Sequence, residues 1–155
     1  EVRCPKCSWR CRCPGCSRDL RVRPPELGGR GPGDAAEEAP EEEIREIIRS
    51  MRAAPQDAEL LESACARLEA RALGPQGRRL IVESGGLEAI LEGMEAQHAH
   101  AGVQERACGA LGNLALRSRE NQSRLARSGG PGAVLASMAA HPGAEAVQAR
   151  AAWAA

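Results

Sequence analysis

A pattern that repeats every 43 or 44 residues is the feature that most constrains how this chain folds. The recurring residues are Met51, Met94 and Met138, the glycine pairs 85–86 and 129–130, and Val103-Gln104 with Val147-Gln148. A fixed period in this range is typical of stacked helical units. Such arrays usually bind other molecules rather than transform them. The pattern therefore predicts a repetitive helical protein with a recognition role.

Within one period the apolar residues follow helical spacing. Leu87, Ile90, Leu91 and Met94 stand at i, i+3, i+4 and i+7, which is one stripe of an amphipathic helix. A second stripe follows from residue 103 to residue 114. The glycine pairs end a unit, because glycine readily adopts the left-handed conformation that terminates a helix. We therefore expect an all-α solenoid.

Composition divides the chain into three zones. Residues 1–23 are cysteine-rich, with seven basic and two acidic side chains. Residues 24–40 mix proline, glycine and acids, which predicts a flexible linker. Residues 41–155 carry the helical repeats, which we divide at approximately 41–86, 87–130 and 131–155, the last incomplete. Because the pattern stops in the middle of a unit, we expect the chain to be a segment of a longer protein.

Charge and hydropathy exclude several classes of partner for the chain as a whole. The formal net charge is zero, so no long-range field attracts nucleic acid or an anionic membrane. No apolar run approaches the roughly 20 residues that a membrane-spanning helix needs. Near the N-terminal arginines only Trp9 could stack on a base. We therefore expect neither membrane insertion nor nucleic-acid binding.

Particular segments resemble the armadillo repeat family. Residues 121–138 resemble the junction between the family's first and second helices, with the glycine pair in place. Residues 103–115, VQERACGALGNLA, are similar to its third helix, and residues 147–154, VQARAAWA, begin that helix again. The resemblance covers residues 41–155. HEAT repeats are the nearest alternative, but the glycine pair and the third-helix signature favour armadillo.

The resemblance implies a right-handed superhelix of three-helix units. Its third helices would line a groove that binds extended peptide segments of partner proteins, with no small-molecule substrate. Cys65 and Cys108 share one repeat position on an apolar face, so we expect buried thiols in a reducing compartment. The expected location is therefore intracellular, in the cytoplasm, the nucleus or both.

The predicted partner-binding residues are Asn113, Gly109, Trp153, Glu105 and Arg106. In family members that bind peptides tightly, Trp and Asn stand four residues apart on the third helix. This chain has Gly109 before Asn113, and Trp153 without its Asn, which favours a general protein-binding groove over one for basic peptides. Helical spacing places Glu105 and Arg106 one turn earlier on the same face.

The two glycines of this helix, Gly109 and Gly112, are expected to leave its face open to the backbone of a partner. Asn113 could then hydrogen-bond that backbone through its amide. The alternative is that Asn113 braces the neighbouring unit.

The N-terminal cysteines suggest a metal site. Cys4, Cys7, Cys13 and Cys16 form the pairs CPKC and CPGC, which could present thiolates to one zinc ion. Only five residues separate the pairs, fewer than in zinc ribbons. Two alternatives stay open: a remnant of a RING-type domain, which would make the parent protein a zinc-binding ubiquitin ligase, and a tail without a folded site.

No arrangement of residues points to catalysis. No Ser, His and Asp combination follows from the spacing, and the glycines at 28–33 lack the ending of a phosphate-binding loop. His98, His100 and His141 are expected to be solvated turn residues. The sequence thus predicts a noncatalytic protein–protein interaction scaffold.

Overall fold

A computed structural model describes residues 41–154, and every regular element in that range is an α-helix. The predicted cysteine-rich segment 1–23 and the predicted linker 24–40 lie outside these residues. The helices are α1 (Glu41–Ala53), α2 (Ala58–Arg71), α3 (Pro75–Glu83), α4 (Gly86–Ala96), α5 (Ala101–Ala115), α6 (Arg119–Arg127), α7 (Gly130–Ala140) and α8 (Glu145–Ala154). None of these helices is long and apolar enough to cross a membrane.

Local side-chain chemistry sets several helix boundaries. The Asp57 carboxylate accepts a hydrogen bond from the backbone N–H of Leu60 at 3.0 Å and caps the start of α2. His100 and Ser118 cap α5 and α6 in the same way. Gly85 and Gly129 have φ values of 77° and 83° and link α3 to α4 and α6 to α7. The first glycine of each pair therefore ends a helix as predicted, because glycine reaches this left-handed region without strain, whereas Gly86 and Gly130 begin the next helices.

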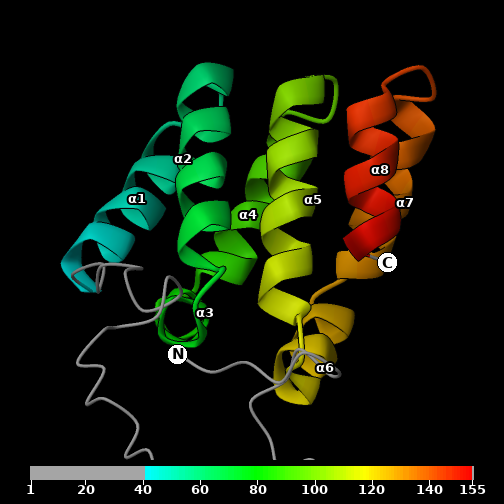
Figure 1. Ribbon diagram of the computed structural model, residues 1–155. Coiled ribbons are helices and arrows are strands. Elements are labelled where there is room, and N and C mark those ends of the chain that lie inside the picture. Colours follow the sequence, from blue (N-terminus) through cyan, green and yellow to red (C-terminus); the bar gives the residue numbers. More distant parts are fainter. Residues whose placement is uncertain (1–40, 155) are drawn as a thin grey trace, which may run out of the picture. The chain divides into compact units, whose positions relative to one another are not determined.

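Helices from successive units lie side by side. α2, α5 and α8 stand in a row, and α4 and α7 lie behind them (Figure 1). The short helices α3 and α6 lie across the lower ends of their units (Figure 1). α5 packs against α2 on one side and against α8 on the other, so it is the central helix of residues 41–154.

The core between these helices is aliphatic. Leu87, Ile90 and Met94 of the predicted stripe are buried, and Leu91 is partly buried. The largest fully buried side chains are Ile44, Ile47, Met51, Leu61, Leu68, Ile81, Leu87, Ile90, Leu111, Leu114, Gln104 and Val103. Each large apolar side chain contributes roughly 1.5–3 kcal/mol on burial. Stability therefore comes from many moderate contacts between neighbouring helices.

Two glutamines at the same repeat position, Gln104 and Gln148, show that the units repeat in structure as well as in sequence. Gln104 donates its side-chain amide to the backbone carbonyls of Met94 at 2.8 Å and Gln97 at 3.0 Å. Gln148 makes the equivalent two bonds at the end of α7, again at 2.8 and 3.0 Å. Carbonyls at a helix C-terminus have no partner within the helix, so each glutamine satisfies two of them. These hydrogen bonds therefore recur from one unit to the next.

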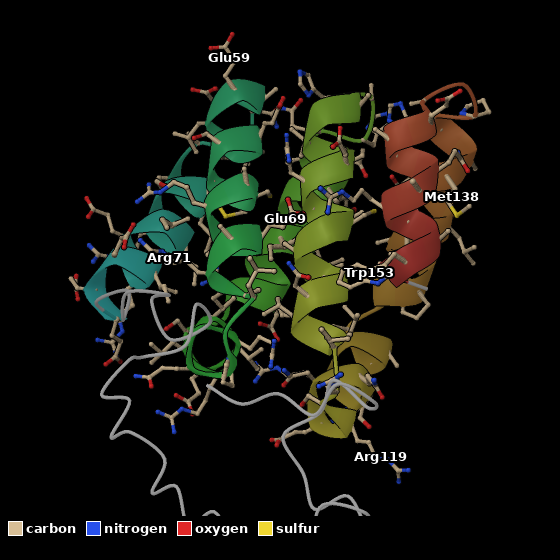
Figure 2. The ribbon with its side chains drawn as sticks, in the orientation of Figure 1. Glu59, Glu69, Arg71, Arg119, Met138 and Trp153 are labelled. Atoms are coloured by element: carbon tan, nitrogen blue, oxygen red, sulfur yellow. The ribbon has the colours of Figure 1, made fainter. Side chains whose placement is uncertain are left out.

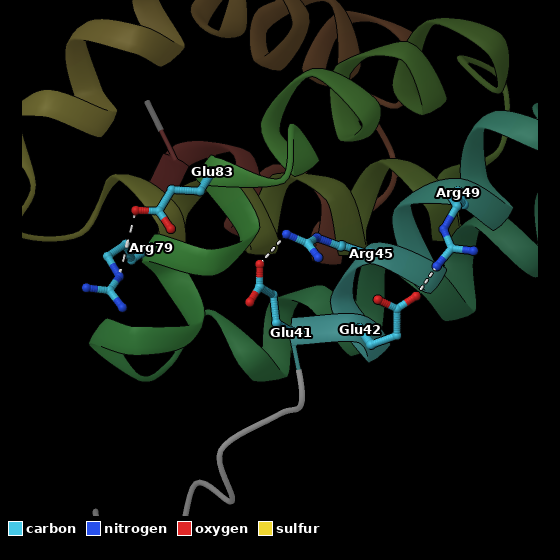
Figure 3. Close-up of polar contacts among 6 residues, drawn as sticks. All are labelled: Glu41, Glu42, Arg45, Arg49, Arg79 and Glu83. Carbon is cyan, nitrogen blue, oxygen red and sulfur yellow. Dashed lines mark hydrogen bonds and ion pairs between the residues drawn. The ribbon is translucent and has the colours of Figure 1, made fainter.

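Ion pairs reinforce the first helices from outside. Exposed pairs on α1 and α3 join Glu41 to Arg45, Glu42 to Arg49 and Arg79 to Glu83 (Figure 3). Such exposed pairs contribute about 0–1 kcal/mol each. Glu43 of α1 instead reaches α2, accepting hydrogen bonds from Arg67 at 2.8 Å and Arg71 at 3.0 Å. The bond from Arg67 is the main reason that the pKa of Glu43 is lowered.

The two cysteines of the repeats are buried and free, which confirms the prediction of core thiols. Burial, followed by the charge of Glu69 and the nearby Cys108, raises the pKa of Cys65 to about 12. Burial also raises the pKa of Cys108, against a hydrogen bond to Ser137. Thiols held neutral in this way are poor nucleophiles.

Because the pKa values of these thiols are raised, we expect the folded state to lose stability in alkali. The pKa of such a thiol is higher in the folded than in the unfolded state. Its contribution to the stability of the folded state is complete at pH values below the unfolded pKa, and it is lost as the pH rises toward the folded pKa. From about pH 8 to pH 10 we expect the free energy of unfolding to fall by roughly 2 kcal/mol, measured by urea denaturation. The sequence has no Tyr and one lysine, Lys6, and its other five cysteines, Cys4, Cys7, Cys11, Cys13 and Cys16, lie outside the described residues.

A variant with Cys65→Ala and Cys108→Ala provides the control, because every other titrating group is kept. Its stability should change less over the same pH interval. In the native wild type, iodoacetamide should leave Cys65 and Cys108 unmodified at about pH 8 in tryptic mass maps. Rapid modification of both thiols, or equal alkaline losses in the two proteins, would contradict the assignment.

Candidate functional site

The row formed by α2, α5 and α8 contains a hollow of about 470 Å³, which we call the third-helix groove. Its lining consists of Ala66, Glu69, Ala70, Leu73, Arg106, Asn113, Arg150 and Trp153. Figure 2 shows Glu69 on the α2 side of α5 and Trp153 on its α8 side. Ala66 and Ala70 of α2 contribute only methyl groups to this lining. The lining thus comes from α2, α5 and α8 and from Leu73, which follows α2.

Glu69 is the centre of charge in the third-helix groove. Its side chain is 12% exposed, and the carboxylate forms an ion pair with each of two arginines. Arg150 of α8 donates Nη1 to Oε1, and Arg106 of α5 places Nη1 3.6 Å from Oε2. Two guanidinium groups therefore share one carboxylate, and the cluster keeps one positive charge in excess.

Asn113 joins α5 to α2. Its Nδ2 donates a hydrogen bond to the backbone carbonyl of Glu69 at 3.0 Å, and the residue is 7% exposed. This contact is the bracing role that the sequence left open beside peptide binding. The other half of the amide, Oδ1, accepts no hydrogen bond from residues 41–154.

The glycines of α5 make room for the chain's own side chains, contrary to the expectation of an open face. A Cβ on Gly112 would lie 2.3 Å from Cε3 of Trp153, and a Cβ on Gly109 would lie 2.5 Å from Oε1 of Glu69. The indole and the carboxylate reach over α5 from the neighbouring helices. They do so because this arrangement covers apolar area and pairs the carboxylate with two arginines.

The structure brings together some of the predicted binding residues. Arg106, Asn113 and Trp153 line the groove, and Gly109 lies beneath the Glu69 carboxylate. Glu105 is not among the lining residues. The predicted zinc ligands Cys4, Cys7, Cys13 and Cys16 lie outside the described residues.

Sequence reasoning missed Glu69, Arg150 and Leu73. The repeat contains a signal for one of them, because Arg106 and Arg150 end the equivalent runs VQER and VQAR, 44 residues apart. Glu69 has no comparable signal, since both of its arginine partners come from later units. Its role depends on how α2, α5 and α8 stack.

A larger hollow of about 730 Å³ lies between α4 and α7. Small residues of α7, such as Gly132 and Ala136, leave this space beside Leu91. Of the acids Glu88, Glu92 and Glu95 in its lining, the first two are already paired with arginines. None of the predicted binding residues lines it, so the third-helix groove remains the candidate site.

Comparison with known families agrees with this architecture. Residues 74–116, which comprise α3, α4 and α5, match the model of the Armadillo/beta-catenin-like repeat family. The chain therefore contains an armadillo-repeat segment, as the sequence predicted, and this segment indicates a protein-interaction scaffold. No curated protein and no solved structure matches the chain.

The family match begins at the short helix α3, whereas our predicted units 41–86, 87–130 and 131–155 begin at the longer helices α1, α4 and α7. How the chain divides into units stays a proposal. The match gives no support to the alternative of a zinc-binding ubiquitin ligase, which depends on residues 1–23.

Proposed function

We propose that residues 41–155 form an armadillo-type right-handed solenoid that binds an extended segment of a partner protein in the third-helix groove. The role is noncatalytic, the partner is a protein, and the location is intracellular. The observation that carries the proposal is the combination of exposed apolar and cationic side chains along one row of helices. Leu73 is 69% exposed and Trp153 is 50% exposed, and both line the groove with Arg106 and Arg150.

Exposed apolar side chains support this assignment. Residues 41–154 expose four large ones, Leu73, Leu116, Leu135 and Trp153, and two of these line the groove. Trp and Arg are enriched where proteins bind each other, because they bury large areas and donate hydrogen bonds. In this groove they stand together in one hollow.

Asn113 offers a hydrogen-bond acceptor to the backbone of a bound segment. Because Nδ2 is engaged with Glu69, the remaining Oδ1 can accept a hydrogen bond from a backbone N–H of a bound segment. Main-chain hydrogen bonds of this sort give affinity for extended peptides without requiring a particular sequence. Asn113 would then both brace α5 and contact the ligand.

The test uses peptides selected from a random nonamer library against the 155-residue chain. Affinities of the selected peptides are measured by fluorescence anisotropy. Leu73→Gln and Trp153→Ala should each weaken binding about tenfold or more, since each removes apolar contact area from the groove. The matched control is Leu135→Gln, an exposed leucine on α7 that does not line the groove. It should change affinity less than about twofold. Equal weakening by Leu73→Gln and Leu135→Gln, or a failure to select any peptide, would refute the proposal.

A further inference from the structure

The Arg106–Glu69–Arg150 cluster combines two positive charges with one negative charge. The two arginines come from different helices, α5 and α8, and their side chains are only partly exposed. Both reach the same carboxylate on α2. No other acceptor for either arginine is found among residues 41–154.

Most N–H donors of the two guanidinium groups have no acceptor within the cluster. Each guanidinium has five N–H donors, so one carboxylate satisfies only a minority of the donors of two arginines. Both arginines line the hollow, where a bound segment would meet them. The cluster is therefore short of acceptors and of negative charge.

Resting on the proposed function, we infer that the third-helix groove selects acidic segments, in which an Asp or Glu carboxylate lies between Arg106 and Arg150. Glu69 occupies this anion position in the free protein. The partner's acid competes with Glu69 for the two guanidinium groups. Leu73 and Trp153 contact apolar side chains next to that acid.

The physical basis is complementarity of charge and geometry. Arginine presents its donors in a planar fork that matches a carboxylate. A lysine or arginine on the partner would instead meet two like charges, which disfavours it. When an incoming carboxylate displaces Glu69, one ion pair is exchanged for another. The internal carboxylate therefore lowers the apparent affinity, because the vacant form of the site is only part of the population.

The peptides selected for the proposed function also test this inference. Asp and Glu should be enriched next to apolar residues. A twin peptide with each acid replaced by its amide should bind the wild type about tenfold more weakly. The variant Arg106→Gln with Arg150→Gln should bind acid and amide peptides equally. Glu69→Gln should bind the acidic peptide about threefold to tenfold more tightly, because the competing charge is removed.

Arg119→Gln is the matched control for charge. Arg119 lies exposed on α6, away from the groove (Figure 2). Replacing it with glutamine removes one positive charge, as replacing either groove arginine does. The ratio of acid to amide affinity should stay unchanged in this variant. Circular dichroism melting of every variant separates loss of binding from loss of fold.

The outcomes separate the two proposals. Peptides that depend on Leu73 but carry Lys or Arg, or an acid preference that survives in the double arginine variant, would overturn the acidic selectivity alone. Weaker binding by a folded Glu69→Gln would overturn the competing role of Glu69. If no selected peptide depends on the groove, the proposed function fails as well.

Discussion

Leu111→Ala is expected to lower the free energy of unfolding by about 3 kcal/mol. Leu111 is fully buried in α5, the helix that packs against both α2 and α8. Removing its isobutyl group takes away apolar contacts and leaves a cavity, and such changes cost roughly 2–5 kcal/mol. Because α2–α5 and α5–α8 are the most extensive contacts between helices of residues 41–154, the loss should affect the whole stack.

Urea denaturation followed by circular dichroism measures this effect. Leu135→Ala is the matched control, since Leu135 lies on α7 and is 62% exposed. Its effect should stay within about 0.5 kcal/mol. Similar midpoints for the two variants would mean that α5 is not the centre of the core.

Gly77→Ala is expected to destabilise the chain by about 2 kcal/mol. Gly77 lies in the first turn of α3, against the end of α2. A Cβ at this position would lie 2.0 Å from the backbone oxygen of Arg71. Backbone cannot move aside as a flexible side chain can, so α3 must shift away from α2, and overpacking of this kind costs about 1–3 kcal/mol.

Gly132→Ala is the control for the intrinsic effect of the same substitution. Gly132 lies in α7, and an added Cβ there would meet nothing within 4 Å. Alanine favours helix over glycine by about 0.5–1 kcal/mol, so this variant should be as stable as the wild type or more so. Thermal melts of the two variants should therefore move in opposite directions. A stabilising Gly77→Ala would show that α3 and α2 do not pack this closely.

The helical architecture could be predicted because its signals are local. The spacing of Leu87, Ile90 and Met94 marks a buried stripe, and all three are buried in the structure. Gly85 and Gly129 end helices through a backbone conformation that depends on their own φ angles. Periodicity and backbone preference act within a few residues, and so they can be recognised without knowing the fold.

The groove could be predicted only in part. Arg106, Asn113 and Trp153 were recognised from the third-helix pattern and do line it. The expectation that Gly109 and Gly112 leave the face open was wrong, because Glu69 and Trp153 cover them. Those covering side chains lie about one repeat away in sequence, so their approach depends on the stacking of units.

The sequence by itself determined that this protein is a row of short helices with aliphatic stripes, because period, glycine placement and capping residues act locally. Only the tertiary structure decided that Glu69 faces Arg106 and Arg150 across three helices. Contacts between groups 37 and 81 residues apart depend on the rise and rotation from one unit to the next. Those quantities are set by the packing of whole helices, which no single stretch of sequence contains.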